Sequence, residues 1–386
     1  MKALFFLPAF LFVIVMRVLR PFVLIRLNCL HSYRIGHFCG NTEVYLCERD
    51  AGMHGNRVFD IFFYDYKVCN HQVLKMWKRI IPVVGPLFAY GIMWVNRKFP
   101  GWEAHEYISK PSQYCDTNGL LDKSKAHLYF TQQEERKGQK ALRDLGIPEG
   151  SPFVCFIARD GAYLDKDFSG EDWSYHNYRN SDIKNFDPAM KWLIDRGYYG
   201  VRMGSVVKNK LPFSYPGIID YAANGMRSDF MDVYLTMKCS FFLFSESGIS
   251  MLAMILRKPV VGANLIPIGF FPAWGKDYVC LPKKLWLTGE KRFLTFREIV
   301  KSEIAFYFEA QQYQKRGLEV VENTSEEIRD AVEEMTARLE NRWETNEEYE
   351  DLQRRFWSLY EPNEILRVFR ARIGAKFLMQ NQDLLK

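Results

Sequence analysis

The sequence lacks the patterns that mark metal-binding, disulfide-bonded and nucleic-acid-binding proteins. Its eight cysteines include no Cys-x-x-Cys pair, and several lie inside apolar runs, so we expect reduced core thiols in a cytosolic protein. Its seven histidines form no His-Glu-x-x-His motif and no close pair, and no metal site is predicted. The formal net charge of +6 has no long basic block, which favours an anionic ligand or a membrane surface over nucleic acid.

A long apolar run that could span a bilayer is also missing. The longest run, from Ala3 to Met16, has fourteen residues, whereas a spanning helix needs roughly 20. No small-x-small cleavage site follows, and Arg17, Arg20 and Arg26 interrupt the next turns. The pattern fits either an interfacial helix with arginines at the level of the lipid head groups or a first buried element.

The composition is that of a folded protein with more than one core. With 48% hydrophobic and 25% charged residues, a chain of 386 residues is long enough for two domains. The clearest linker is Glu149 to Pro152, and a buried strand begins immediately after it at Phe153. We therefore expect a first domain over residues 1–148, a second over residues 149–325, and C-terminal helices over residues 326–386 that pack back on the first domain.

The stretch from Cys239 to Asn264 has the order of a strand, loop, helix and strand. Its first strand ends at Phe244, and the turn Ser245-Glu246-Ser247-Gly248-Ile249 opens the helix. Open α/β sheets bind ligands at the carboxyl ends of their strands. The unpaired N–H groups of a helix start, beside a glycine and serine hydroxyls, suit a phosphate or a ribose. An ordinary strand-to-helix turn is the alternative interpretation.

Two arginines lie at equivalent positions in the same predicted sheet. Arg159 and Arg202 each stand at the carboxyl end of a predicted strand, so we expect them to converge with the turn at residues 245–249. Two guanidinium groups and a helix N-terminus can clamp a diphosphate and stabilise a leaving nucleoside diphosphate without a metal. Either arginine could instead be a surface or salt-bridge residue.

Two further patterns each allow a functional and a purely structural interpretation. Gly36-His37 follows the first predicted strand, where an imidazole could act as a general base in a cleft or could be a structural histidine. Asp165 and Asp167 form an Asp-x-Asp pair of the kind that holds a divalent ion under a sugar diphosphate. This pair lies in a hydrophilic loop, and such pairs often arise by chance.

Several short motifs, each occurring once, are spread over most of residues 30–340. They are Arg34-Ile-Gly-His37, Ala158-Arg159-Asp160 with Tyr163, Tyr178-Arg179-Asn180-Ser181-Asp182-Ile183, Arg202-Met203-Gly204, Ile219-Asp220-Tyr221-Ala222, Ser247-Gly248-Ile249 and Glu322-Asn323-Thr324. In combination they resemble a bacterial family of GT-B glycosyltransferases associated with cell-surface polysaccharide gene clusters. The Arg159-Asp160 element is also similar to the strand-end arginine motif of fucosyltransferases that use a GDP-sugar, and Ser247-Gly248 resembles the donor loop of other GT-B enzymes.

The resemblance implies an α/β fold of GT-B type, with two Rossmann-like domains facing a cleft and a helical C-terminal tail. It implies a metal-independent glycosyltransferase without a cofactor, which moves a sugar from a nucleotide-sugar donor to a hydroxyl of a glycan or a lipid-linked acceptor. His37 or Asp160 is the expected catalytic base. The expected substrate-binding residues are Arg159, Arg179, Asn180, Arg202, Gly204, Ser205, Ser245, Glu246, Ser247, Gly248, Ile249 and Asn264.

The expected location is cytoplasmic and peripheral on the inner face of the cell membrane, with the membrane surface as a partner and no nucleic acid. Two other functions stay open. A nucleotide-sugar epimerase of similar two-domain build would need extra acid–base carboxylates in the cleft and no acceptor. A non-catalytic, membrane-associated scaffold of polysaccharide assembly would tolerate the loss of Arg159 and Arg202.

Overall fold

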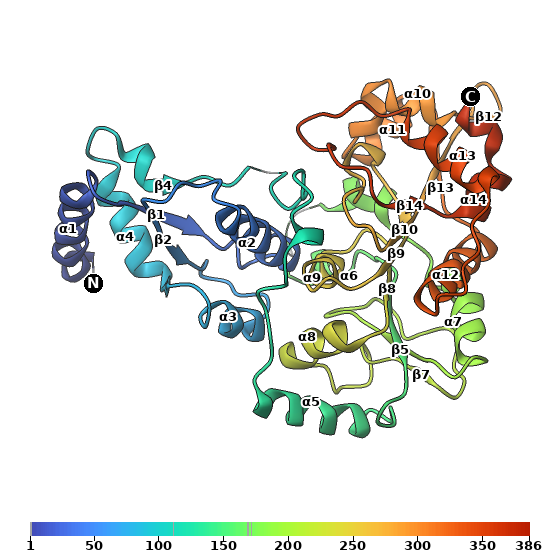
Figure 1. Ribbon diagram of the computed structural model, residues 1–386, viewed down its shortest axis with the longest axis horizontal. Coiled ribbons are helices and arrows are strands. Elements are labelled where there is room, and N and C mark those ends of the chain that lie inside the picture. Colours follow the sequence, from blue (N-terminus) through green and yellow to red (C-terminus); the bar gives the residue numbers. More distant parts are fainter. Residues whose placement is uncertain (1, 111, 168–169, 171) are drawn as a thin grey trace.

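The computed structural model describes residues 2–110, 112–167, 170 and 172–386, with the side chains of these residues from Leu7 onward except that of Asp167. It has two α/β domains, each built on a parallel sheet (Figure 1). All eight cysteines are free thiols, and six of them are buried, as the sequence predicts. Within the described residues, no helix combines the length and the apolar character needed to cross a bilayer.

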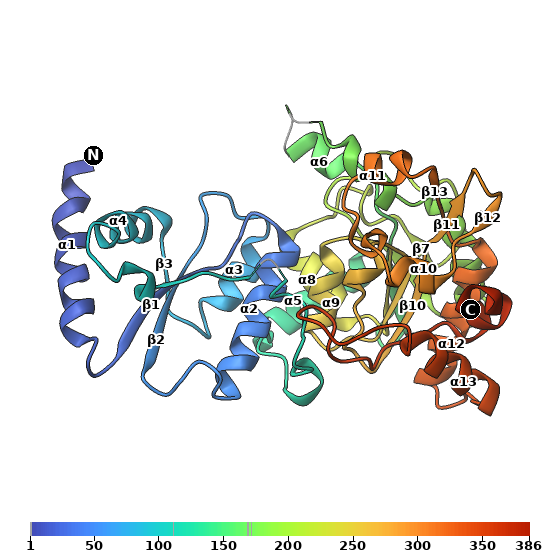
Figure 2. The same ribbon diagram turned by 90° about the horizontal axis from the view of Figure 1, so that it is seen from above.

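The first domain contains a four-stranded sheet of order β3-β2-β1-β4. Its strands are β1 (Leu24–Cys29), β2 (Val58–Phe63), β3 (Val83–Val84) and β4 (Glu106–Tyr107), and its helices are α1 (Lys2–Leu19), α2 (Ile35–Asp50), α3 (His71–Trp77) and α4 (Pro86–Asn96). Helix α1 lies along α4 at the end of the molecule opposite the second domain (Figures 1 and 2). A small core that includes Ala9, Val13 and Ile92 joins these two helices to the sheet.

The second domain contains a seven-stranded sheet of order β14-β10-β9-β8-β5-β6-β7, in which every neighbouring pair is parallel. Its strands are β5 (Phe153–Ile157), β6 (Tyr199–Arg202), β7 (Ile218–Ile219), β8 (Phe242–Phe244), β9 (Val260–Leu265), β10 (Tyr278–Pro282) and β14 (Arg372–Ile373). The antiparallel strands β11 (Lys284–Leu287), β12 (Arg292–Phe293) and β13 (Leu318–Val321) form a third, smaller sheet.

Helices cover the second sheet and continue to the C-terminus. They are α5 (Gln132–Asp144), α6 (Ala162–Asp167), α7 (Asp187–Ile194), α8 (Asp229–Lys238), α9 (Ile249–Ile255), α10 (Phe296–Val300), α11 (Ala310–Lys315), α12 (Ser325–Leu339), α13 (Glu347–Trp357) and α14 (Ala375–Gln380). A capping box begins α12, with the Thr324 hydroxyl accepting from the Glu327 N–H and the Glu327 carboxylate accepting from the Thr324 N–H.

The C-terminal helices pack on the second domain, which corrects the expected packing of residues 326–386 on the first, and the segment before β14 reaches the first domain through the Arg370–Asp122 ion pair. Strand β14 pairs with β10 at the edge of the second sheet, and α12 packs against α7 and β10. The reason is apolar burial, because Ile373 and Phe377 are 0% and 1% exposed in the core of this domain. The tail is helical as expected, apart from the short strand β14.

The strand order places a ligand-binding position between β5 and β8. From β5 the chain proceeds outward through β6 and β7 on one side, and β8, β9 and β10 follow on the other. Loops that leave two adjacent strands in opposite directions create a crevice at their carboxyl ends. This confirms the expected GT-B-like architecture of two Rossmann-like domains with a cleft between them.

Candidate functional site

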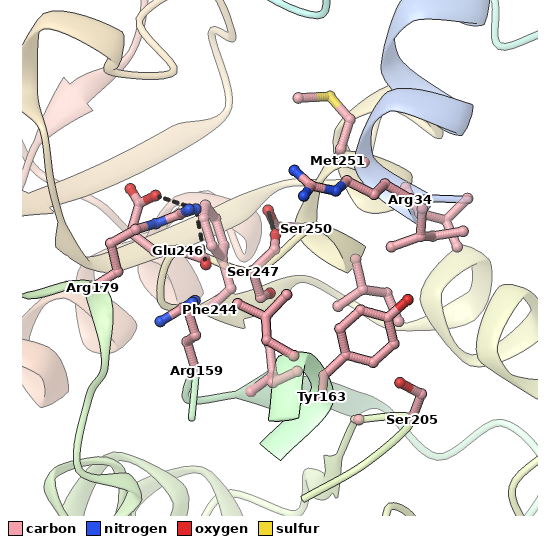
Figure 3. Close-up of a pocket in the computed structure, with 18 of the residues that line it drawn as sticks. Arg34, Arg159, Tyr163, Arg179, Ser205, Phe244, Glu246, Ser247, Ser250 and Met251 are labelled. Atoms are coloured by element: carbon pink, nitrogen blue, oxygen red, sulfur yellow. Dashed lines mark hydrogen bonds and ion pairs between the residues drawn. The ribbon is translucent and has the colours of Figure 1, made fainter. Parts of the chain in front are cut away.

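A cavity of about 420 Å³ lies between the two domains. Its walls include the loops that follow β1 and β2 in the first domain and β5, β6, β8 and β9 in the second. Arg34 reaches into it from the start of α2, whereas Arg159 and Arg179 approach from the second domain (Figure 3). The cavity therefore lies at the carboxyl edges of both parallel sheets, where α/β proteins bind their ligands.

Two glycines allow the domains to meet beside this cavity. A Cβ atom on Gly248 would lie 3.2 Å from Ile35 Cγ2 and 3.3 Å from the Gly36 nitrogen. A Cβ atom on Gly36 would lie 3.4 Å from the Gly248 Cα. The first turns of α2 and α9 are consequently close together, and both open toward the cavity. Gly248 is one of the residues predicted from the sequence, and its small size is needed for this approach.

Arg159 is held in place by two other predicted residues. Its backbone N–H donates to the Ser245 hydroxyl at 2.8 Å, which ties the loop after β5 to the loop after β8. Its guanidinium donates to the His176 carbonyl at 3.2 Å and to the side-chain oxygen of Asn180. Ser245 and Asn180 are not among the residues that line the cavity, so their role is to position Arg159.

Arg179 and Glu246 form an ion pair at the wall of the cavity. The Arg179 Nη2 lies 3.2 Å from a Glu246 carboxylate oxygen, and the other oxygen of Glu246 accepts from the Ile266 N–H at 3.3 Å. The Arg179 Nε–H is buried and has no hydrogen-bond partner within the described residues. The cavity wall therefore contains a buried N–H that can donate a hydrogen bond to a ligand oxygen.

Burial and neighbouring arginines shift two pKa values at the cavity. Burial and the charge of Arg179 lower the pKa of Arg159 to about 10. Burial, together with the charges of Arg179, Arg159 and Arg34, lowers the pKa of His176 to about 4. Burial is the larger cause of both shifts, and the arginine charges act in the same direction, so an anion placed among these arginines would be stabilised.

His37 faces the cavity from the first turn of α2. Its Nδ1 lies 3.3 Å from the Asn41 side-chain oxygen, and its ring packs edge-on against Tyr114 with the centroids 5.5 Å apart. Burial lowers the pKa of His37, and the charges of His31 and Arg34 act in the same direction against the hydrogen bond to Asn41. The imidazole is therefore neutral at pH 7, the form that can accept a proton.

Asp160 also lines the cavity, but its carboxylate is already occupied. One oxygen accepts from the Ala162 N–H at 3.1 Å and the other from the Lys208 N–H at 3.0 Å. These bonds join the loop after β5 to the loop after β6. In the described structure, backbone N–H groups donate to both carboxylate oxygens of Asp160 and to neither ring nitrogen of His37. His37 is therefore the better placed of the two predicted bases.

Besides Asn180 and Ser245, two more predicted binding residues lie outside the cavity. Arg202 is 4% exposed and donates to the Asn209 carbonyl at 2.8 Å and to the Asp220 carboxylate at 3.4 Å. Arg202 therefore stabilises the loop after β6. This is the salt-bridge role that the sequence left open as the alternative to phosphate binding. Asn264 is 0% exposed and exchanges hydrogen bonds of 2.6 Å with Asn323, each backbone N–H donating to the other side-chain oxygen. Neither side chain lines the cavity.

The remaining predicted residues do line the cavity. They are Arg179, Gly204, Ser205, Glu246, Ser247, Gly248 and Ile249. The Ser247 hydroxyl is buried and has no hydrogen-bond partner in the described part of the chain. A buried hydroxyl without a partner beside Arg179 is a second group available to a ligand.

Sequence reasoning missed Arg34 and His176 as residues of the cavity. Arg34 is part of the motif that ends in His37, and its place directly before a helix start was a usable signal. His176 stands in a polar loop far from any predicted strand end, so nothing in the sequence pointed to it. Asp165 of the Asp-x-Asp pair is exposed and does not line the cavity, and the Asp167 side chain is outside the described part.

A separate group of possible metal ligands lies in the first domain. Glu43, Cys47 and His127 offer ligand atoms within 4.8 Å of one another. The Arg257 Nη2 from the second domain already lies 2.8 Å from the buried Glu43 carboxylate and 3.5 Å from the Cys47 sulfur. The group is therefore already neutralised by a guanidinium from the other domain.

His127 in this group is held as a cation. Burial alone would lower its pKa, but hydrogen bonds with Cys47, Glu43 and Asp50 and the charge of Glu43 raise the pKa to about 10. Its two ring nitrogens lie 3.2 Å from Glu43 and 2.9 Å from Asp50. An imidazolium has no lone pair for a metal. We describe these residues as an ion-pair network that joins the two domains.

No protein-family model matches the chain, and no curated protein matches it. Among solved structures, it is similar to the Escherichia coli ADP-heptose lipopolysaccharide heptosyltransferase II, at 13% identity and a TM-score of 0.45 over 69% of this chain and 92% of that one. It is also similar to a family 9 glycosyltransferase from Veillonella parvula, at 11% identity and a TM-score of 0.49 over 81% and 97% of the two chains. With TM-scores below 0.5, the fold assignment rests on the two parallel sheets and the cleft of this chain.

Proposed function

We propose that this protein is a glycosyltransferase that moves a sugar from a nucleotide-sugar donor to an acceptor hydroxyl without a metal ion. The observation that carries the proposal is the convergence of Arg34, Arg159 and Arg179 on the interdomain cavity, where burial and the charges of these arginines lower the pKa of His176. A diphosphate is the anion that fits several converging guanidinium groups. Three arginines can also stabilise the charge that develops on a leaving nucleoside diphosphate.

The roles of the residues follow from their positions. Arg159 and Arg179 bind the diphosphate, and the Ser247 hydroxyl and the first turn of α9 lie beside it. Ser245 and Asn180 hold Arg159 in its orientation. His37, from the other domain, is the base that takes the proton of the acceptor hydroxyl, a role that presumes inversion at the anomeric carbon.

The pH dependence of the rate tests the role of His37. Because the pKa of His37 is lowered, the neutral base persists at pH 7, and kcat/KM should stay constant above that pH and fall only below the ordinary histidine pKa of about 6.5. His37→Gln should lower kcat by about 100-fold or more, the usual contribution of a general base. A variant that retains kcat, or a rate that still climbs between pH 7 and pH 9, would exclude His37 as the base.

A turnover assay distinguishes the three functions considered. The protein is incubated with a panel of UDP-, GDP-, ADP-, CMP- and dTDP-sugars, with and without a polysaccharide or glycolipid acceptor, and released nucleotide and changed sugars are measured. Acceptor-dependent release of a nucleoside diphosphate is the expected result. An altered sugar still attached to its nucleotide would identify an epimerase, and the absence of turnover across the panel would favour a scaffold.

A further inference from the structure

Helix α1 exposes a row of large apolar side chains on the outer end of the first domain. Leu7, Leu11 and Val18 recur at helical spacing and are 63%, 54% and 66% exposed. Among the described side chains, the large apolar ones that are at least 37% exposed on α1 or directly after it are Leu7, Leu11, Ile14, Val15, Val18, Leu19 and Phe22. Contiguous exposed apolar surface of this kind marks an interaction site.

The opposite face of α1 is already used to attach the helix to its domain. Ala9, Val13 and Met16 are 0% to 1% exposed in the small core shared with α4. Arg17 strengthens the attachment, because its guanidinium donates to the Asn96 side chain at 2.9 Å and to the Pro100 carbonyl at 2.9 Å. The helix is thus fixed lengthwise on the domain, and its exposed row is not needed to hold it there.

The two segments that supply this surface are basic, and the acidic Glu103 and Glu106 follow directly after the second of them, where Glu106 pairs with Arg97 at 2.7 Å. Residues 1–42 contain five basic residues and no acidic one, and residues 66–102 contain six basic residues and no acidic one. These two segments supply α1 and α4. Arg20 and Lys98 are exposed near the C-terminal ends of the two helices, and Lys98 lies 5.2 Å from the ring centroid of the exposed Trp94. Basic residues and an aromatic ring beside an apolar row are complementary to a lipid surface with negative head groups.

We propose that α1 and the C-terminal end of α4 dock on the surface of an anionic lipid bilayer. Helix α1 lies flat, the side chains of its exposed row enter the boundary between head groups and acyl chains, and Arg20 and Lys98 contact anionic head groups. A second copy of the chain is the competing occupant. A symmetric dimer through this face would place the same basic segments against each other, and such like-charge contacts are unfavourable.

The orientation of α1 fixes the position of the cleft above the bilayer. Helix α1 is at the end of the molecule opposite the second domain in both views (Figures 1 and 2), and β1 leads from it toward the loop that lines the cavity. Six residues of strand span about 20 Å. If the proposed transfer reaction holds, the acceptor is a lipid-linked glycan long enough to bring its hydroxyl that far from the lipid.

Vesicle sedimentation of the full chain tests the docking surface. We compare vesicles of phosphatidylcholine with vesicles that contain 30% phosphatidylglycerol, at low and high salt, for the protein and for the double variant L11E/V18E. The matched control is M226E/L339E, which adds the same charges at apolar positions that are 43% and 38% exposed on the second domain. We expect at least about tenfold stronger binding to the anionic vesicles, a loss of at least about tenfold in L11E/V18E, and no loss in the control.

Each other outcome would overturn the proposal. Equal binding by L11E/V18E and the protein would remove α1 as the docking surface, and no sedimentation with either vesicle would exclude a lipid surface. A dimer that dissociates in L11E/V18E, without vesicle binding, would assign the face to a second copy. Vesicle binding needs no nucleotide, so its failure is distinct from a failure of the proposed transfer reaction, and a cooperative melting transition of L11E/V18E verifies its fold.

Discussion

Replacing Arg179 by glutamine is expected to weaken the binding of a nucleoside diphosphate by about 10- to 100-fold. A hydrogen bond to a charged group contributes about 1.5 to 3 kcal/mol, which corresponds to that range. The substitution also leaves the Glu246 carboxylate without its cationic partner at the cavity wall, where a negative charge repels a phosphate. Calorimetric titration of the variant and the unaltered protein with the same nucleotide measures the change.

Arg202→Gln is the matched control for Arg179→Gln. Arg202 is an arginine of the same domain that sequence reasoning placed in the clamp, but its guanidinium bonds to Asp220 and the Asn209 carbonyl outside the cavity. We expect its loss to lower the melting temperature and to leave the Kd for the nucleotide unchanged. The opposite pattern, with Arg202 affecting the Kd and Arg179 not, would refute the assignment of the cavity as the nucleotide site.

Arg257→Ala is expected to reduce the free energy of unfolding by about 1.5 to 3 kcal/mol, because it removes a charged hydrogen bond to the buried Glu43 carboxylate and leaves that carboxylate paired with the His127 imidazolium. The Glu43 side chain is 0% exposed. The guanidinium also donates to the Ser124 hydroxyl at 3.0 Å and the Ser124 carbonyl at 3.2 Å, and these contacts cross between the domains. Denaturant unfolding monitored by circular dichroism measures the loss.

The control for Arg257 is Arg354→Ala on α13. The side chain of Arg354 is 60% exposed, and its partners Glu347 and Asp351 are also exposed. Ion pairs of this kind contribute about 0 to 1 kcal/mol, so the control should barely change the stability. Equal losses for the two arginines would show that the network of Glu43 and Arg257 does not join the domains.

The sequence predicts the second sheet because each strand is a short apolar run that ends in a polar turn. Arg159 and the turn at residues 245–249 meet as predicted, since they follow adjacent parallel strands. Arg202 stands at the end of β6 by the same rule, but its side chain is 4% exposed beneath the loop that it stabilises. A strand-end position fixes where a backbone is and leaves the direction of the side chain undetermined.

Other features depend on contacts between distant segments. The pairing of Asn264 with Asn323 joins residues far apart in the chain, and a polar residue at a strand end gives no sign of such a partner. The C-terminal segment has charged amphipathic helices that could cover either domain. Its position depends on the pairing of β14 with the free edge of β10, and that edge exists only in the folded sheet. His176 reaches the cavity from a short 3-10 helix, Ser174–Arg179, which no periodic apolar pattern in the sequence indicates.

A nucleotide binding screen tests the central claim most directly. The melting temperature is measured with UDP, GDP, ADP, CMP and dTDP, each with and without EDTA. A ligand at 100 times its Kd stabilises the folded state by about 2.7 kcal/mol. We predict a clear rise with at least one nucleoside diphosphate that EDTA does not remove. A rise that requires a divalent ion, or no rise with any nucleotide, would contradict a metal-free diphosphate site between the two domains.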